Sequence, residues 1–310
     1  MSDKKTKYPL IIIGTGPAGL MASVYASRYK IEHLMIGEFL GGMIIGAHKI
    51  GNFPAEKEIS GIELITRMKE QVDSLGVTMV HNKVADIKKE GQDFKITTQN
   101  GKEFQAEAIL LANGTENRKL NLPNEDDFLG KGVSYCATCD AMFFRDKIVV
   151  VVGGSDSANM ASLYLADVAK KVYQIYRGDN LKGEVLRIEK IKNNSKIEVI
   201  YNTEVMALVG DGKLEKVILS NSYNGQDELV VDGMFVEIGT IPQGELAEAL
   251  SVEVDEKKYI KVGTDQKTNQ EGVWAAGDIT TGSNNFHQVI TACSEGAIAA
   301  ESIFKFLQNK

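Results

Sequence analysis

The feature that most constrains the fold is a pattern that occurs twice: an apolar strand, a glycine-rich turn and a helix. Residues 9–13 (PLIII) precede the turn Gly14–Gly19, a helix-like segment and a second apolar segment at 33–37. The same order recurs from residue 147, where KIVVVVGGSDSANMASLYLADVA is followed by an apolar segment at 172–176. A strand, a tight turn, a helix and a strand make a βαβ unit. Two such units predict an α/β fold with two Rossmann-like nucleotide-binding domains.

Two polar or glycine-containing segments mark the expected domain boundaries. The stretch Glu116–Glu125 separates the two βαβ units, and a second hinge is expected near Gly239–Gly244. The segment WAAGDI and a long apolar helix after this hinge have no obvious place in the second unit. We therefore expect a discontinuous first domain made of residues 1–115 and 244–310, with the second domain, residues 116–243, inserted into it.

Composition and charge narrow the classes of partner. The chain has 310 residues, 43% of them hydrophobic and 25% charged, as in an ordinary globular protein. Its 35 basic and 42 acidic side chains give a net charge of -7, which argues against nucleic acid or an anionic membrane as the main partner. No stretch approaches the roughly 20 apolar residues that span a bilayer. The N-terminal apolar run stops at Gly14 without a small-residue cleavage site, so we expect a cytoplasmic protein.

The chain has only three cysteines, Cys136, Cys139 and Cys293, which excludes a four-cysteine zinc site, and no metal is expected. In a reducing compartment a CxxC pair is more often catalytic than structural, although a half-formed metal site or a buried thiol pair is the alternative. The spacing allows a reducible disulfide, and a helix beginning there would lower the thiol pKa. Asp140 follows the pair and is a candidate general acid. Cys293 lies among small residues of an apolar helix and is interpreted as a core residue.

The first glycine-rich turn matches G-x-G-x-x-G between a strand and a helix, the pattern that binds a dinucleotide pyrophosphate. Its candidate cofactor-binding residues are Gly14, Gly16, Pro17, Ala18 and Gly19. The acidic residue that usually ends the second strand is absent, and Glu38 is the nearest candidate for the adenosine ribose hydroxyls. The alternative for Glu38 is a solvated surface residue.

The second turn is a variant of the same pattern, in which a serine replaces the second glycine. Its candidate cofactor-binding residues are Gly153, Ser155, Asp156, Ser157 and Ala158. The Ser155 side chain must point away from the phosphates if a dinucleotide binds here; the alternative is a purely structural turn. NADP selectivity would need positive charge beyond the next strand, where Arg177 and Lys182 are the only candidates.

Two further motifs lie near the C-terminus. Gly277 and Asp278 end an apolar stretch, where a backbone and a carboxylate can meet the ribityl or phosphate region of a cofactor, although Gly-Asp is also a common turn. His287 and Gln288 precede an apolar helix whose N-terminus can face a ring carbonyl that gains negative charge on reduction. The alternative for His287 is a surface or capping histidine.

These motifs together resemble the low-molecular-weight thioredoxin reductases over nearly the whole chain. The resemblance is carried by GTGPAGL, GG at 41–42, NFP at 52–54, SGIEL, GVSYCATCDAMFF, VVGGSDSA, GVWAAGDIT and QVITACSEGAIAA. It implies a homodimer with FAD in the first domain and NADPH in the inserted domain. It adds Gly42, Asn52 and Val289 to the cofactor-binding residues, with Gln288 and Val289 at the pyrimidine edge of the flavin.

The resemblance also implies a chemistry. Reduced nicotinamide passes hydride to the flavin, the flavin reduces the Cys136–Cys139 disulfide, and the dithiol reduces thioredoxin or a similar CxxC protein. Cys139 would face the flavin, Cys136 would attack the partner disulfide, and Asp140 would be the general acid. In the family the nicotinamide domain rotates between the two half-reactions.

The sequence departs from the family at the NADPH signature. Where the family has His-Arg-Arg and a further Arg, this chain has Tyr176, Arg177, Gly178 and Lys182. Each lost charge-assisted bidentate contact costs on the order of 1.5–3 kcal/mol, or roughly 10- to 100-fold in affinity. We therefore predict weak NADPH selectivity, which leaves NADPH, NADH or a donor such as reduced ferredoxin.

Two other classes of function agree less well with these residues. An FAD-dependent dithiol oxidase would keep the CxxC but lose the nicotinamide site, so the near-intact VVGGSDSA counts against it. A non-enzymatic flavoprotein or redox-responsive binding module would not need Cys136, Cys139 and Asp140 together.

Overall fold

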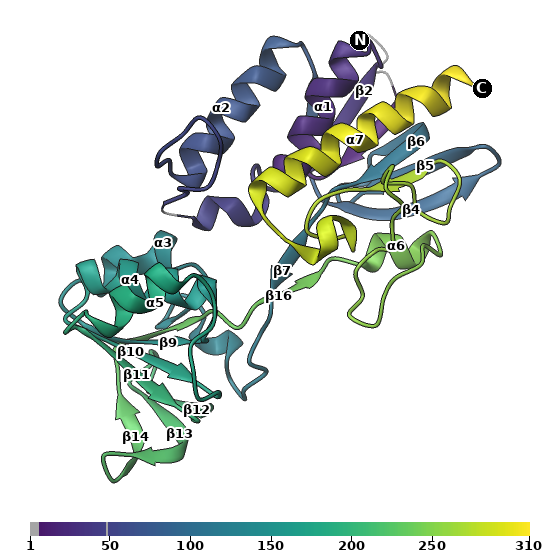
Figure 1. Cartoon of the computed structure of the whole chain (residues 1–310). Coiled ribbons are helices and arrows are strands. Elements are labelled where there is room, and N and C mark those ends of the chain that lie inside the picture. The colour runs from purple at the N-terminus through teal and green to yellow at the C-terminus, as the bar shows by residue number, and fades with distance from the viewer. Residues whose placement is uncertain (1–5, 48) are drawn as a thin grey trace. The chain divides into compact units, whose positions relative to one another are not determined.

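The computed structural model describes residues 6–47 and 49–310. The chain forms two compact units, Met1–Glu116 with Ile241–Lys310, and Asn117–Thr240, so that both chain ends belong to the first unit (Figure 1). The chain crosses between the units twice, and the two crossing strands, β7 (Thr115–Asn117) and β16 (Thr240–Pro242), pair with each other. These crossings fall within the segments Glu116–Glu125 and Gly239–Gly244, where hinges were expected from the sequence.

The first unit contains a mixed seven-stranded sheet in the order β3-β2-β1-β6-β5-β4, with β17 also paired to β6. In chain order its strands are β1 (Lys7–Ile13), β2 (His33–Gly37), β3 (Thr78–His81), β4 (Val84–Glu90), β5 (Asp93–Thr98), β6 (Glu103–Leu111) and β17 (Val273–Ala275). Strand β1 pairs in parallel with β2 and β6, whereas β4, β5 and β6 form an antiparallel meander. The carboxyl end of β1 therefore lies between two parallel neighbours, where the first glycine-rich turn begins.

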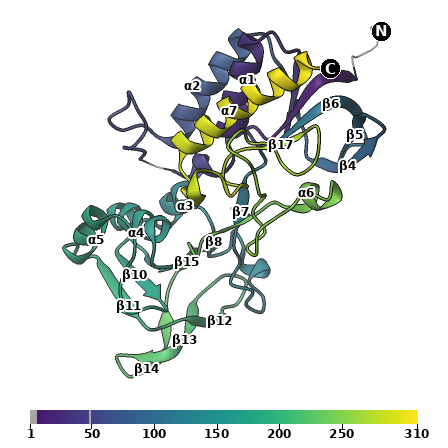
Figure 2. The same cartoon turned by 45° about the vertical axis from the view of Figure 1, so that its right-hand side comes forward.

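Three helices pack on one face of this sheet: α1 (Pro17–Arg28), α2 (Gly61–Ser74) and α7 (Val289–Gln308), which lie side by side in both views (Figures 1 and 2). Helices α1 and α7 can approach closely because Gly296 has no Cβ: a Cβ there would lie 2.1 Å from the Ala18 carbonyl oxygen. Ser60 caps α2 by accepting a hydrogen bond from the Glu63 backbone N–H. The short helix α6 (Glu245–Ala249) contributes to the core on the opposite face.

The second unit contains a fully parallel five-stranded sheet in the order β11-β10-β9-β15-β8. These strands are β8 (Val133–Ser134), β9 (Ile148–Val152), β10 (Lys171–Tyr176), β11 (Ile197–Tyr201) and β15 (Gly233–Val236). The other elements are helices α3 (Ala137–Asp140), α4 (Asp156–Val168) and α5 (Val185–Lys192), and an antiparallel sheet of β12 (Val205–Val209), β13 (Lys216–Tyr223) and β14 (Gln226–Val230). Alternate valines of β9 enter two cores, one beneath α4 and one beneath β12–β14, which explains its continuous apolar run.

The predicted α/β class with two Rossmann-like units is confirmed. In each unit a parallel strand, a glycine-rich turn and a helix follow one another, as β1 and α1 in the first and as β9 and α4 in the second. Within the described residues, no helix combines the length and the apolar character that crossing a membrane requires.

Candidate functional site

The first glycine-rich turn contains glycines of two kinds. Gly14 has a φ of 118°, and a Cβ there would lie 2.0 Å from the Ala112 carbonyl oxygen; a Cβ at Gly19 would lie 2.1 Å from the Gly14 oxygen. Gly16 has an ordinary φ of -82°, and the nearest atom to an added Cβ is 3.6 Å away. Backbone and packing thus require Gly14 and Gly19 but not Gly16. A glycine that the chain itself does not need is expected where a pyrophosphate approaches the backbone.

Two hydrogen bonds connect the segment after β2 to this turn. The Thr15 hydroxyl donates a hydrogen bond to the Phe39 carbonyl at 2.9 Å, and the Gly41 N–H donates to the Thr15 carbonyl at 2.8 Å. These bonds hold Glu38 and Gly42, both exposed, beside the glycine-rich turn. Both residues therefore lie at the carboxyl ends of β1 and β2, beside the turn that is predicted to bind a dinucleotide.

The Gly277–Asp278 motif lies against the beginning of α1. Gly277 has a φ of 83°, and a Cβ there would lie 2.9 Å from the Ala18 Cβ. The Gly277 N–H and the Thr280 hydroxyl both donate to Oε2 of Glu295, at 2.8 and 2.9 Å. Glu295 is only 4% exposed and belongs to α7. Glu295 was not predicted from the sequence, although a single acid within the apolar run VITACSEGAIAA was a signal for it.

Asp278 and His287 lie close enough to interact electrostatically. Burial raises the pKa of Asp278, and the nearby His287 opposes this increase. Among the residues that the structure describes, none forms a hydrogen bond with the buried Nε2 of His287. The His287 ring lies 5.0 Å from that of Tyr259. Since buried polar groups are normally hydrogen-bonded, this nitrogen fits a polar ligand such as a ribityl chain.

The N-terminus of α7 brings together residues that are distant in sequence. Gln288 caps the helix, and its Oε1 accepts a hydrogen bond from Nδ2 of Asn52 at 2.9 Å. Val289 is the first residue of the helix and is half-buried. Asn52 was predicted to lie near the flavin, and Gln288 and Val289 to meet the pyrimidine edge of its ring; the Asn52–Gln288 bond brings these segments together.

The second turn is closely packed against its own unit. Gly153 has a φ of 144°, and a Cβ there would lie 2.1 Å from the Glu237 carbonyl oxygen. The Tyr176 ring covers Gly154, where an added Cβ would lie 2.3 Å from it. Ser155 is exposed and caps no helical N–H.

Some charged residues near the second glycine-rich turn are paired within the unit, and others are not. Asp156 accepts hydrogen bonds from the Glu184 N–H and from the Arg187 guanidinium, both at 2.9 Å. The Lys182 N–H bonds the Gly154 carbonyl at 2.7 Å, but within the described residues neither the Lys182 nor the Arg177 side chain has an ion-pair partner. These two exposed cations remain available for a ligand.

Glu237 was not expected from the sequence at this site. It follows β15 directly and is largely buried, and this burial raises its pKa to about 7 despite a hydrogen bond with Ser157. An isolated acid in the apolar segment GMFVEIG was the available signal.

The CxxC pair forms a disulfide between Cys136 and Cys139. Cys136 is the N-cap of the short helix α3, and its sulfur accepts the Cys139 backbone N–H at 3.2 Å. The Asp140 N–H donates to the Cys136 carbonyl, and Ser134 Oγ accepts the Cys136 N–H at 3.0 Å. The pair and the half-buried Asp140 thus form one compact turn with a hydrogen-bond donor on the Cys136 sulfur.

A buried carboxylate accepts hydrogen bonds from the segment that leads to the disulfide. Glu125 is 4% exposed and accepts hydrogen bonds from the Leu120 and Leu122 N–H groups, both at 3.1 Å, and from the Tyr135 hydroxyl. Burial, together with this carboxylate, raises the pKa of Tyr135. Nδ2 of Asn117 donates to the Tyr135 carbonyl at 3.2 Å. No role in the site was predicted from the sequence for these residues.

The surface beside the disulfide is apolar. Met142 and Phe143 follow the pair and are 54% and 73% exposed. Cys293, in contrast, is buried in the first unit, where burial raises its pKa to about 12, and its interpretation as a core residue is confirmed.

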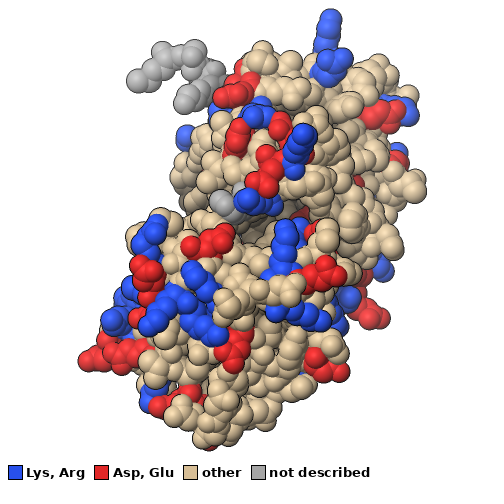
Figure 3. All heavy atoms as spheres, turned by 60° about the vertical axis from the view of Figure 1, so that its left-hand side comes forward, with Lys and Arg blue, Asp and Glu red and all other residues tan. Residues whose placement is uncertain are grey.

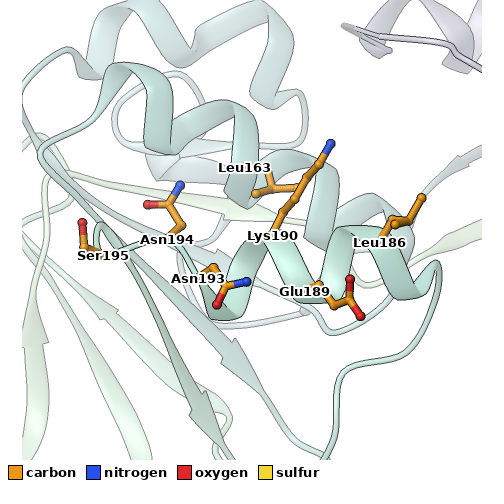
Figure 4. Close-up of a pocket in the computed structure, with 7 residues that line it drawn as sticks. All are labelled: Leu163, Leu186, Glu189, Lys190, Asn193, Asn194 and Ser195. Carbon is orange, nitrogen blue, oxygen red and sulfur yellow. The ribbon is translucent and has the colours of Figure 1, made fainter.

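A shallow hollow of the second unit is separate from these residues. It has a volume of about 610 Å³ and is lined by Leu163, Leu186, Glu189, Lys190, Asn193, Asn194 and Ser195, from α4, α5 and the segment after α5 (Figure 4). It shares no residue with the glycine-rich turn or the disulfide. Basic and acidic side chains are intermingled on the face drawn in Figure 3.

Known proteins match this chain over nearly its full length. The pyridine nucleotide-disulphide oxidoreductase family matches residues 8–296. A thioredoxin reductase of Peptoclostridium acidaminophilum is 39% identical over 310 residues, which cover 97% of each chain. The crystal structure of Lactococcus lactis thioredoxin reductase in the FR conformation has a TM-score of 0.92 at 33% identity, covering 98% of this chain and 100% of that one. A ferredoxin-flavin thioredoxin reductase from Clostridium acetobutylicum has a TM-score of 0.54 at 34% identity, covering 99% and 100%.

Proposed function

The chain belongs to the pyridine nucleotide-disulphide oxidoreductase family, and we propose that it is a thioredoxin-disulfide reductase that carries FAD. The observation that supports this most strongly is the Cys136–Cys139 disulfide in one turn with Asp140, in a chain so similar to thioredoxin reductases. When bound, the flavin supplies the electron pair that opens this disulfide, and reduced nicotinamide is its source.

The first unit would hold the FAD. Gly16 leaves room for the pyrophosphate at the N-terminus of α1, and the Asp278 carboxyl group would meet the ribityl region. Gln288 and Val289 would meet the ring at the N-terminus of α7, beside Asn52. Glu38 would accept hydrogen bonds from the adenosine ribose.

The chain's own sulfurs would carry out the exchange with the protein substrate. The Cys136 thiolate, stabilised by the Cys139 N–H, attacks one sulfur of the thioredoxin disulfide and forms a mixed disulfide. The thioredoxin sulfur that leaves takes a proton from Asp140. The Cys139 thiolate then attacks the Cys136 sulfur, which restores the Cys136–Cys139 disulfide and releases reduced thioredoxin. Met142 and Phe143 provide exposed apolar surface for this partner.

The second unit would bind the electron donor, NADPH or NADH, at the glycine-rich turn before α4. Arg177 and Lys182 lack ion-pair partners among the described residues and can face a 2′-phosphate, but Gly178 contributes no cation, so we propose weak NADPH selectivity. Reduced ferredoxin is the second candidate donor. It is favoured by the sparse cations at this site and by the 34% identity to a ferredoxin-flavin thioredoxin reductase. We also propose that the protein is a homodimer in the cytoplasm.

The test is anaerobic reduction of the purified flavoprotein with NADPH, NADH or reduced ferredoxin, followed by addition of thioredoxin while flavin absorbance is recorded. We expect the flavin to be bleached by a donor and reoxidised by thioredoxin. Cys139→Ser should abolish the second step, whereas the matched control Cys293→Ser should leave it intact. Thioredoxin reduction at full rate by Cys139→Ser would refute the proposed mechanism.

A further inference from the structure

Glu237 lies at the point of the second sheet where a ligand is expected. Strands β10 and β11, which follow β9 in the chain, lie on one side of β9 in the sheet. The later strand β15 pairs with β9 on the other side. In open parallel sheets ligands bind at such a switch point, outside the carboxyl ends of the strands. Here those ends are Gly153, after β9, and Glu237, after β15, whose carbonyl oxygen lies 2.1 Å from a Cβ built on Gly153.

The Glu237 carboxyl group faces the first turn of α4. It is largely buried and forms a hydrogen bond with Ser157, the second residue of that helix. The diphosphate of a dinucleotide binds at the same helix terminus in this fold. A ligand diphosphate and the Glu237 carboxyl group would therefore share one weakly hydrated crevice.

Within the part of the chain that the structure describes, no charged side chain compensates Glu237. Its raised pKa of about 7 is caused by burial, Ser157 lowers it, and no charged side chain contributes. Asp156, the nearest acid on α4, is held by Arg187 and by the Glu184 N–H. On β10, the Tyr176 ring covers Gly154.

An ionised Glu237 would repel a diphosphate, because a low-dielectric crevice strengthens the interaction of two like charges. A protonated carboxyl group removes this repulsion and adds a hydrogen-bond donor. We propose that Glu237 makes dinucleotide binding to the second unit proton-coupled: the site binds a nucleoside diphosphate ester with Glu237 protonated and rejects it with Glu237 ionised. The identity of the ligand as a nicotinamide dinucleotide rests on the proposed function.

The size of the effect follows from the fraction of protonated sites. With a pKa of about 7, half of the sites are protonated at pH 7. At pH 8.5 only about 3% are protonated, so the Kd is expected to increase about 15-fold between these two values.

The experiment is calorimetric titration of the oxidised flavoprotein with NAD⁺ and NADP⁺ between pH 6 and 9. NAD⁺ is decisive because its diphosphate does not titrate in this range, whereas a 2′-phosphate does. We expect a Kd for NAD⁺ that rises about 15-fold from pH 7 to 8.5 in the wild type. In Glu237→Gln the Kd should stay nearly constant, and the matched control Glu189→Gln, an exposed acid on α5, should behave like the wild type.

A second readout needs no variant. Titration at pH 7.5 in two buffers of different ionisation enthalpy should show net proton uptake by the wild type. A Kd that is independent of pH, an unchanged pH dependence in Glu237→Gln, or no binding of either dinucleotide at any pH would overturn the proposal. Thioredoxin reduction by the dithionite-reduced enzyme tests the proposed function separately, because it does not use this site.

Discussion

Replacing Glu125 by alanine tests whether this buried carboxylate positions the segment that carries the disulfide. Its side chain is 4% exposed and accepts hydrogen bonds from Leu120, Leu122 and Tyr135. Each buried donor left without an acceptor costs about 1–3 kcal/mol. Water can reach the two half-buried backbone groups, so the lower part of that range applies, and we expect a total loss of about 3–5 kcal/mol for Glu125→Ala.

The assay is thermal unfolding of the flavoprotein, in which a loss of this size in a chain of this length lowers Tm by about 5–8 °C. Glu125→Gln keeps an acceptor oxygen and should lose about 1–2 kcal/mol, and Tyr135→Phe about 1 kcal/mol. Because Tyr135 directly precedes Cys136, Glu125→Gln and Tyr135→Phe should also reduce small disulfides more slowly than the wild type. Asp126→Ala is the matched control: it removes only the exposed ion pair with Lys119, for which about 0.5 kcal/mol or less is expected.

A single outcome refutes the reasoning about Glu125. If the free energy of unfolding of Glu125→Ala lies within about 1 kcal/mol of the values for the wild type and for Asp126→Ala, the Glu125 carboxylate does not stabilise this segment. A double-mutant cycle of Glu125→Gln and Tyr135→Phe should then show no coupling, whereas the structure predicts about 0.5–1.5 kcal/mol.

Four further predictions follow from the sites. Gly16→Ala should fold normally yet lose affinity for FAD, whereas Gly14→Ala should also destabilise the fold; flavin retention and unfolding of the apoprotein distinguish these outcomes. A Cβ at Gly178 would lie 2.7 Å from the Tyr176 ring, so Gly178→Arg is combined with Tyr176→Ala and compared with Tyr176→Ala alone; the arginine should raise the preference for NADPH over NADH by roughly 10- to 100-fold, and an unchanged ratio of the two Kd values would contradict the assignment of the 2′-phosphate site. Phe143→Ala should raise KM for thioredoxin several-fold and leave the reduction of a small aromatic disulfide unchanged, and equal effects on both substrates would rule out a docking role. Since the pKa of Glu237 is raised from 4.5 to about 7, its contribution lowers stability as pH rises through that window; Glu237→Gln should therefore match the wild type near pH 4 and exceed its unfolding free energy at pH 8, by at most about 3 kcal/mol.

Much of this protein was predictable because its decisive patterns are local. A buried strand, a glycine that needs a positive φ and a helix follow one another within about twenty residues, so the two βαβ units, the turn glycines and the CxxC turn could be located in the chain itself. The apolar run around Cys293 likewise placed this residue in the core. Such patterns depend on neighbours in sequence, and they determine the class of fold and the position of the dithiol.

Only the tertiary structure decided which distant segments meet. Asn52 forms a hydrogen bond with Gln288, which lies 236 residues later in the sequence. Glu237 lies against Gly153 because β15 pairs with β9. Glu125 and Glu295 are buried because hydrogen-bond donors converge on them, which residue spacing does not reveal. A lone acidic residue in a sequence is compatible with either solvent or a buried site. Long-range packing decides between them, because it alone determines how much water and how many donors each carboxylate retains.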